Sequence, residues 1–327
     1  MSRKTLVILL LVVLVLSAVW ALTAYQRARK TQELLTALAE RDDAAATEAM
    51  AQLRHRGPKV GLRLVGYLTS ENERVRWRAA VLCAEVGAKQ SEVVDGLVRL
   101  LVDPVPAVQR AAALACGALQ LEEAEQPLIA LVSNKEQTPS SRAFAAEALG
   151  SLRSEDAVEP LTTLLRERPP VPPKEPEAAV AEAKPTAPAA PPPPPDDLWQ
   201  ARWQAAMALG EIGTAKCVEV LAESVRADLE PRIDVRMAAA YALADALANP
   251  DARKALGTGV DALLQAMSDE AGDVRVAAAI SLARTYPPKD KVPQVETTLR
   301  EHLDDDHYWV REAVKLAMAQ LKISRTG

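Results

Sequence analysis

The chain has 327 residues, of which 49% are hydrophobic, 25% are charged and only 3% are aromatic. It contains 61 alanines, and a composition this rich in Ala and poor in aromatic residues favours helices and excludes an all-β fold. Five of the 39 basic side chains lie in residues 1–30, which contain no acid, and the other 34 accompany 44 acidic ones. Because an acidic surface repels phosphate groups, nucleic acid is not expected as a partner.

Near its N-terminus the chain has an uncharged and mostly apolar run, TLVILLLVVLVLSAVWALTAY, over residues 5–25. Such a run is long enough for a helix to cross the roughly 30 Å of hydrocarbon in a bilayer. Trp20 and Tyr25 fall near one end, where aromatic rings prefer the membrane interface. We predict that residues 1–30 form a single-pass transmembrane anchor. A cleaved signal peptide, with Arg3 and Lys4 as its basic region, is the alternative.

Two features of this segment give opposite predictions for its orientation. Arg27, Arg29, Lys30 and Arg41 come after the apolar run, and this excess of basic residues favours a cytoplasmic location for the rest of the chain. The very short tail ahead of the run is typical of a segment that exports the remainder of its chain. We expect the rest of the chain on the extracytoplasmic side, with the cytoplasmic side as the alternative.

A motif recurs through the remainder of the chain. It consists of an apolar or small residue, Arg, two variable residues, two small residues that are usually Ala, and Leu or Cys three positions further on. Copies begin at Val75, Val108, Ser141, Ala201, Val235, Val274 and Val310, and a degenerate copy begins at Asp42. The first three copies are spaced by 33 residues, and this period is typical of an array of structural repeats.

A second apolar segment comes after each copy except the last, so each unit is predicted to be a helix, a turn and a helix. Gly87, Gly150 and Gly213 lie at or near the expected turns, where the end of a helix favours a positive φ. Neither helix of a unit can bury its apolar face alone. Stacking of successive pairs solves this problem and produces an α-solenoid.

The arginine of the motif lies on the buried side of the predicted helix, in its first turn. We therefore expect a structural role for the repeat arginines, in which they reach acidic residues or helix-end carbonyls at the repeat junctions. The repeat arginines are Arg76, Arg142, Arg202, Arg236, Arg275 and Arg311. The expected acidic partners or helix caps are Asp103, Asp234, Asp269, Asp273 and Asp306.

The motif resembles the HEAT-repeat family, especially its short-period form, which also occurs in phycobilisome chromophore lyases. The resemblance depends on the Asp-Val-Arg runs at 234–236 and 273–275 and on the Arg-x-x-Ala-Ala core, and it extends over roughly 42–323. It implies an all-α, right-handed α-solenoid of about seven to eight helix-turn-helix repeats, which binds proteins along an extended surface.

A proline-rich stretch interrupts the repeats. Residues 169–195 contain 12 of the 23 prolines, and removing these 27 residues restores a spacing of 33 between the copies on either side. We predict a disordered Pro/Ala-rich insertion over 169–197, with repeats at 31–168 and 198–327 that form one continuous solenoid. A linker between two half-solenoids is the alternative. A further hypothesis is that Pro191–Pro195 docks into an aromatic groove of a partner.

No catalytic or cofactor-binding motif is found in the sequence. Cys83, Cys116 and Cys217 are expected to be buried thiols. His302 and His307 are five residues apart and so do not share a helix face, which argues against a metal site. We therefore expect a protein that is not an enzyme and that has no metal, no cofactor and no small-molecule substrate.

Four aromatic residues are candidates for partner binding. Trp77 and Trp203 occupy the same position in their repeats, away from the core, and Tyr308 and Trp309 lie just ahead of the last repeat arginine. Such aromatic side chains are typical of binding hot spots, although packing against neighbouring helices is the alternative. The sequence thus predicts a membrane-tethered, non-catalytic scaffold for protein–protein interaction. The alternative is a chromophore lyase-like enzyme subunit or assembly factor of the HEAT-repeat type.

Overall fold

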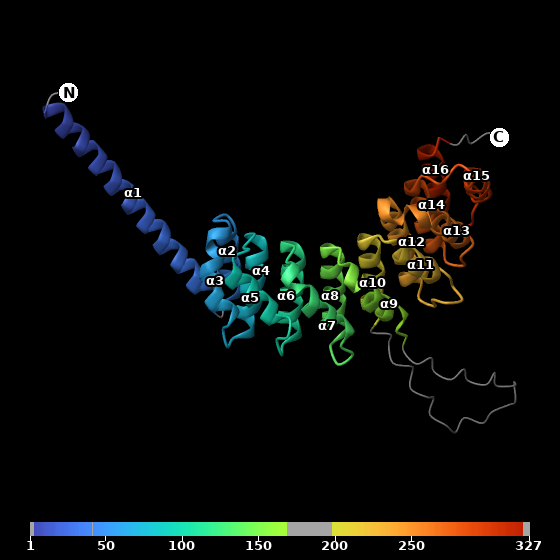
Figure 1. Ribbon diagram of the computed structural model, residues 1–327, viewed down its shortest axis with the longest axis horizontal. Helices are drawn as coiled ribbons and strands as arrows, with labels where there is room; N and C mark the ends of the chain where they lie inside the picture. Colours follow the sequence, from blue (N-terminus) through green and yellow to red (C-terminus); the bar gives the residue numbers. More distant parts are fainter. Residues whose placement is uncertain (1–2, 41, 169–197, 323–327) are drawn as a thin grey trace, which may run out of the picture. The chain divides into compact units, whose positions relative to one another are not determined.

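The computed structural model describes residues 3–40, 42–168 and 198–322, with side chains from residue 10 onward. These residues form sixteen α-helices and a few 3-10 turns, and they contain no β-strand, which confirms the predicted all-α fold (Figure 1). The chain divides into two compact units, residues 1–115 and 116–327. The division falls within one helix and not at the proline-rich stretch. The predicted insertion over 169–197, Pro191–Pro195 included, lies outside the described residues.

Unit 1 contains a long N-terminal helix and the first repeats. Its helices are α1 (Arg3–Leu38), α2 (Asp43–Arg54), α3 (Gly61–Leu68), α4 (Glu73–Glu85), α5 (Ser91–Leu100) and most of α6 (Pro106–Leu119). Helix α2 packs on α1 and α4, and α3 packs on α4 and α5. The side chains of Asp42 and Asn72 cap α2 and α4 by accepting hydrogen bonds from backbone N–H groups, which explains where these helices begin.

Helix α1 runs without a break through the expected boundary at residue 30. Its side chains from Leu10 to Lys30 are exposed, whereas Leu34, Leu35 and Leu38 are buried in unit 1. The part from Leu10 to Leu38 is long and apolar enough to cross a membrane, because an 18-residue window within it has a mean hydropathy of 1.6. These properties are shared by membrane spans and signal sequences.

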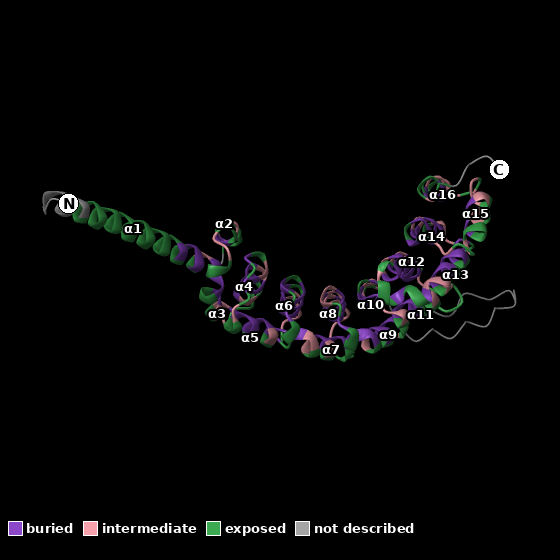
Figure 2. Cartoon of the chain, turned by 45° about the horizontal axis from the view of Figure 1, so that its top comes forward, coloured by how far each residue is buried: buried purple, intermediate pink, exposed green. Residues whose placement is uncertain are grey.

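Unit 2 contains the remaining repeats in two layers. Its helices after α6 are α7 (Glu125–Ser133), α8 (Pro139–Leu152), α9 (Val158–Arg166), α10 (Trp199–Ile212), α11 (Ala215–Ser224), α12 (Ile233–Ala248), α13 (Leu256–Ala266), α14 (Gly272–Thr285), α15 (Val292–Glu301) and α16 (Tyr308–Gln320). The first helices of the repeats, α8, α10, α12, α14 and α16, stack in one layer, and the second helices form the other (Figure 2). Both layers contain buried residues, as expected for an α-solenoid.

Small residues allow the first helices to stack closely. A Cβ atom on Gly150 of α8 would lie 2.7 Å from the Cα atom of Ala208 in α10. The same relationship joins Gly210 of α10 to Ala242 of α12 at 2.9 Å. This contact requires a small residue at both positions, which lie seven and nine residues after the start of each motif copy. It also shows that α8 packs directly on α10, although residues 169–197 separate them in the sequence.

The phase of the repeat is confirmed. Each motif copy starts two residues after the beginning of a helix; these helices are α4, α6, α8, α10, α12, α14 and α16. The predicted positive φ angles are confirmed for Gly87 (69°) and Gly213 (66°). The prediction for Gly150 was wrong, because it lies inside α8 where a helix neighbour requires a residue without a side chain. Arg153 adopts the left-handed conformation that ends α8.

Candidate functional site

The repeat arginines form a ladder of buried ion pairs at the junctions between repeats. The Nε and Nη2 atoms of Arg236 donate to the two carboxylate oxygens of Asp269 at 2.8 and 2.9 Å. Its Nη1 atom donates to the backbone carbonyls of Glu230 and Pro231. Arg76 binds Asp103 in the same bidentate manner. These arginines therefore connect one repeat to the start of the next, as predicted.

The acidic partners were predicted only in part. Asp103, Asp269 and Asp306 contact repeat arginines as expected, but so do three acids that were not predicted: Glu167, Glu230 and Asp305, which bind Arg142, Arg202 and Arg275. Asp234 instead pairs with Arg232, and Asp273 lies in the first turn of α14. A signal was present in the sequence, because Asp103, Glu230, Asp269 and Asp305 each stand six residues before the motif arginine or its replacement.

The ladder controls the protonation of its carboxylates. Hydrogen bonds from Arg142 lower the pKa of Glu167. Burial by itself raises the pKa of Asp305, but hydrogen bonds from Arg275 and the His307 backbone N–H outweigh it and hold this pKa at about 2. Both carboxylates are therefore charged at neutral pH. The last repeat arginine, Arg311, donates to the backbone carbonyls of Asp305 and Asp306.

The four predicted aromatic residues do not form one site. Trp77 lies on α4 in unit 1 and is 42% exposed. Tyr308 and Trp309 lie at the start of α16 in unit 2, where they are 54% and 63% exposed and their rings make an edge-to-face contact of 5.0 Å. Trp203 lies on α10 and is half-buried in a groove.

The groove around Trp203 has a volume of about 480 Å³ and lies across three first helices. We call it the aromatic groove and define it by Phe144 of α8, Trp199 and Trp203 of α10, and Met237 of α12. Phe144 and Trp199 were not predicted, because only the stacking of α8 on α10 brings them to Trp203. A concave apolar surface of this volume is typical of sites that accept a ligand or an anchoring side chain.

Polar groups surround the aromatic groove. Ser140, Gln200, Gln204 and Asp234 contribute to its lining and provide hydrogen-bond donors and acceptors. The guanidinium of Arg232 lies 5.4 Å from the ring centre of Trp199 and also pairs with Asp234 at 2.8 Å. The groove thus combines apolar and polar side chains, as protein-binding surfaces do.

Acidic side chains extend along the same layer of helices. Gln204 donates to Glu147 of α8, and Glu147 in turn lies close enough to Glu211 of α10 to affect its charge. Burial raises the pKa values of Glu147 and Glu211, and repulsion from Glu147 and Asp245 adds to this effect for Glu211. Negative charge therefore lies beside the groove.

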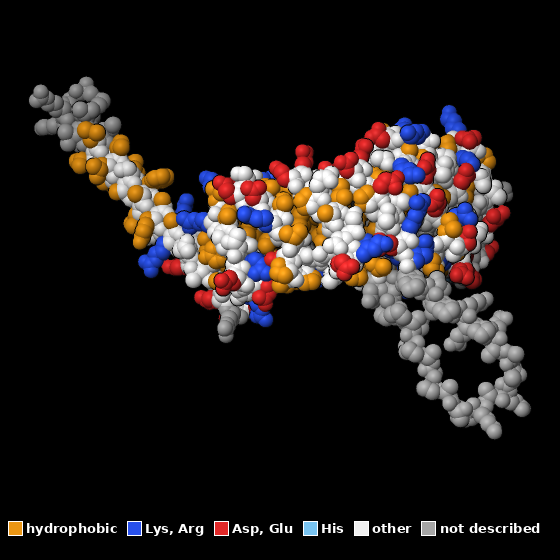
Figure 3. Space-filling model, turned by 60° about the horizontal axis from the view of Figure 1, so that its bottom comes forward, with side chains coloured by type: hydrophobic (Ala, Val, Ile, Leu, Met, Phe, Trp, Pro, Cys, Tyr) orange, Lys and Arg blue, Asp and Glu red, His pale blue; other side chains and the backbone are white. Residues whose placement is uncertain are grey.

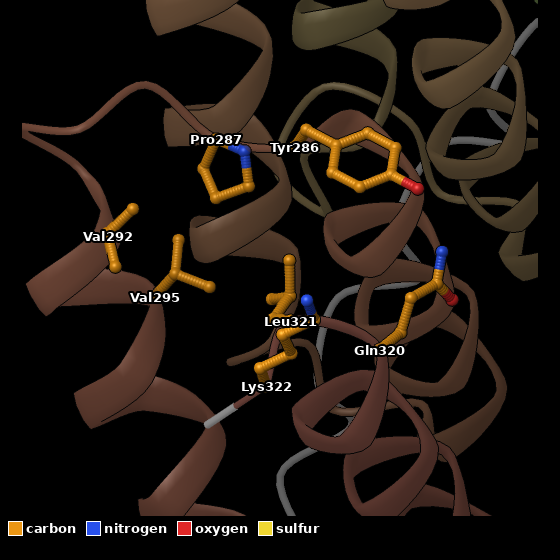
Figure 4. Close-up of a pocket in the computed structure, with 7 residues that line it drawn as sticks. All are labelled: Tyr286, Pro287, Val292, Val295, Gln320, Leu321 and Lys322. Atoms are coloured by element: carbon orange, nitrogen blue, oxygen red, sulfur yellow. The ribbon is translucent and has the colours of Figure 1, made fainter. Parts of the chain in front are cut away.

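A second hollow of about 300 Å³ lies near the C-terminus (Figure 4). Val292 and Val295 of α15 form one wall, and Leu321 and Lys322 at the end of α16 form the other. The described lining of this hollow includes one aromatic ring, that of Tyr286, whereas the aromatic groove has three, those of Phe144, Trp199 and Trp203. The aromatic groove is therefore the stronger candidate.

The described residues contain no group of three or more His, Cys, Asp or Glu side chains placed to hold a metal ion. The Nδ1 atom of His302 lies 2.9 Å from the carbonyl oxygen of Thr298, and His307 packs against Gly272. Cys83, Cys116 and Cys217 are buried free thiols, as predicted.

Comparisons with known proteins agree with the fold. Models of HEAT repeats match residues 61–139, 97–173 and 260–326, which together exceed half of the chain. A model of the PBS lyase HEAT-like repeat matches residues 201–226. No curated protein sequence matches the chain.

Several solved structures match the chain. The X-ray structure of YibA from Escherichia coli matches with a TM-score of 0.53 at 15% identity, over 92% of this chain and 97% of YibA. The complex of CpcE and CpcF of phycocyanin lyase from Nostoc sp. matches with a TM-score of 0.45 at 21% identity, over 79% of this chain and 93% of that chain. An engineered protein matches with a TM-score of 0.44 at 19% identity, over 89% and 78%. At these identities the similarity concerns the fold alone.

Proposed function

The chain belongs to the HEAT-repeat family, and we propose that it is a membrane-tethered, non-catalytic scaffold that binds a partner protein in its aromatic groove. The groove is the observation that carries this proposal. It places Trp199, Trp203 and Phe144 together on a surface built from three stacked helices. Half-buried tryptophans with polar neighbours are the usual anchors of protein–protein binding.

Charge defines the kind of partner in this proposal. Asp234 lines the groove but is already paired with Arg232, whereas Glu147 is hydrogen-bonded to Gln204, which also lines the groove. A partner segment with one large apolar side chain next to a Lys or Arg residue would fill the groove and pair with Glu147. The attraction between the charges would make association faster at low salt than at high salt.

The exposed and apolar part of α1 supports the membrane tether. Its described side chains from Leu10 to Leu16 are all more than half exposed, which is costly in water but favourable in lipid. Figure 3 shows hydrophobic side chains along this part of α1 and basic side chains near its junction with the repeats. We propose that the repeats lie on the extracytoplasmic side; the alternative is the cytoplasmic side, which the basic residues after the apolar run favour.

Membrane topology is tested with fusions to the C-terminus of the full chain. Alkaline phosphatase that is active in the membrane fraction supports an anchor with extracytoplasmic repeats. Fluorescence of the C-terminal fusion without phosphatase activity would instead place the repeats on the cytoplasmic side. Phosphatase activity in the soluble fraction would show that the N-terminal segment is a cleaved signal sequence.

The groove is tested by replacing an exposed residue of its lining, because this leaves the buried core intact. Gln200 is exposed, so Gln200→Arg places a long positive side chain in the groove and should abolish capture of the partner from solubilised membranes. Gln294→Arg is the matched control, because Gln294 is an exposed residue of α15. Equal capture by both variants, with unchanged thermal stability, would contradict the proposal.

A further inference from the structure

The turn between α2 and α3 contacts α1 just after the apolar segment of α1 ends. The Nη1 atom of Arg56 donates to the carbonyl oxygen of Arg27 at 3.2 Å and to the Oγ1 atom of Thr31 at 2.7 Å. The Nη1 atom of Arg63 donates to the carbonyl oxygen of Ala28 at 3.4 Å. The end of α2, the turn after it and the start of α3 therefore lie against residues 27–31 of α1.

These contacts fix the depth of the turn relative to the apolar part of α1. The uncharged run ends at Tyr25, and α1 is continuous to Leu38. A helix rises about 1.5 Å per residue, so residues 27–31 lie within about 9 Å of that end. The headgroup layer of a bilayer is roughly 5–8 Å thick on each side. A membrane that contains the apolar run therefore places the turn at the level of the headgroups.

The turn and the adjoining part of α1 together carry a concentration of basic side chains, which we call the basic collar. It consists of Arg27, Arg29, Lys30, Arg54, Arg56, Lys59 and Arg63. Two acids accompany it: Glu33 pairs with Arg29 and Lys30, and Glu85 pairs with Arg54. Positive charge thus remains in excess around residues 27–31.

Three other acidic residues of this region lie at the opposite end of α2. Glu40, Asp42 and Asp43 surround the start of α2, and the collar surrounds its end. The twelve residues of α2 separate the two ends by about 18 Å. Asp43 is also bound by Arg78, whose other hydrogen bonds go to the carbonyls of Leu38 and Glu40. The positive charge therefore faces the apolar part of α1, and the negative charge faces away from it.

An exposed apolar side chain accompanies the collar. Leu62 lies in the first turn of α3, next to Arg63, and is 53% exposed. Gly61 and Leu64, on either side of this pair, are buried, so the helix presents Leu62 and Arg63 together on its outer face. A leucine beside basic residues is the combination that segments lying in the membrane interface use.

We propose that the basic collar is a second membrane contact, which binds anionic lipid headgroups while Leu62 enters the interface. This inference depends on the proposed membrane anchor. Guanidinium and ammonium groups bind lipid phosphates through charge-assisted hydrogen bonds, and basic segments next to a membrane span are attracted by anionic lipids. Because α1 joins the collar without a break, the contact would hold unit 1 at a defined distance from the bilayer.

The test uses the full chain in nanodiscs made of phosphatidylcholine alone or mixed with phosphatidylglycerol. A fluorescent probe is attached to Leu62→Cys, since the native cysteines are buried and do not compete for the label. We expect lipid-bound spin labels to quench this probe several-fold more in the anionic discs than in the neutral ones. Lys30→Glu together with Lys59→Glu should remove the difference.

The control probe is Val102→Cys, because Val102 is 79% exposed and lies just after α5 in the same unit. The proposed lipid contact of the collar would be contradicted if the Leu62 probe were quenched no more than the Val102 probe while the chain remained integrated in the disc. This outcome would not contradict the membrane anchor. Integration is measured separately by resistance to alkaline carbonate in membranes. Release by carbonate would overturn the anchor, and the collar with it.

Discussion

Arg236 and Asp269 form a bidentate ion pair in which both side chains are at most 2% exposed. Arg236 lies in the first turn of α12, and Asp269 precedes α14, so the pair joins one repeat to the next. The Oδ1 atom of Asp269 also accepts the backbone N–H of Ala271. Every strong polar group of this junction is thereby satisfied without water, which is the condition for a buried charge to be tolerated.

Removing one member of this pair should destabilise unit 2 strongly. Arg236→Ala leaves the charge of Asp269 buried and uncompensated, and we expect a loss of about 3–5 kcal/mol of unfolding free energy. Arg236→Met combined with Asp269→Leu removes both charges and should recover most of this loss. Urea unfolding of the full chain, followed by circular dichroism, measures both effects.

The exposed pair between Arg226 and Asp228 provides the comparison. Arg226→Ala should leave the unfolding midpoint unchanged, because an exposed ion pair contributes little to stability. If Arg226→Ala lowered the free energy of unfolding as much as Arg236→Ala, burial would not explain the contribution of the ladder to stability.

Stability should decrease in acid as Asp305 becomes protonated. Its pKa is about 2 in the folded chain against an ordinary value of 3.8, so the folded state binds fewer protons between these values. The resulting stabilisation, about 2 kcal/mol, is complete above pH 4 and is lost as the pH falls towards 2. The reduced pKa of Glu167 acts in the same direction.

The measurement is urea unfolding at a series of pH values for the native chain and for Asp305→Asn. The variant should be less stable at neutral pH and should lose less stability between pH 4 and pH 2. If the unfolding free energy of both proteins changed equally with pH, protonation of Asp305 would not explain the loss of stability in acid.

The fold could be predicted from the sequence, whereas the candidate site could be predicted only in part. The motif gives the position of each first helix because its alanines must face another helix. The groove depends on which repeats are neighbours, and this information is not local. Trp77 and Trp203 have the same position in the motif, yet only Trp203 has Phe144 and Met237 beside it.

Packing of α8 on α10 should be sensitive to one added methyl group. Gly150→Ala would place a Cβ atom 2.7 Å from the Ala208 Cα atom, and the backbone cannot move away easily. We expect a loss of about 1–3 kcal/mol, as for other overpacked cores. Gly66→Ala in α3 is the control, because its Cβ atom meets nothing within 4 Å and should stabilise the helix by about 0.5–1 kcal/mol. Equal stability of the two variants would favour two half-solenoids separated by residues 169–197.

The native thiols should be unreactive until the repeats unfold. Burial raises the pKa of Cys83 to about 12, and the same cause raises the pKa of Cys116 to about 12. A shift from the ordinary value of 9 leaves about a thousandfold less thiolate at pH 8, and the thiolate is the reacting species. Cys83 lies in α4 and Cys116 lies in α6, the helix that the two units share, so labelling with a thiol reagent at increasing urea reports on the opening of each helix. Rapid labelling of either cysteine in the absence of urea, identified by peptide mass, would show that its helix opens readily.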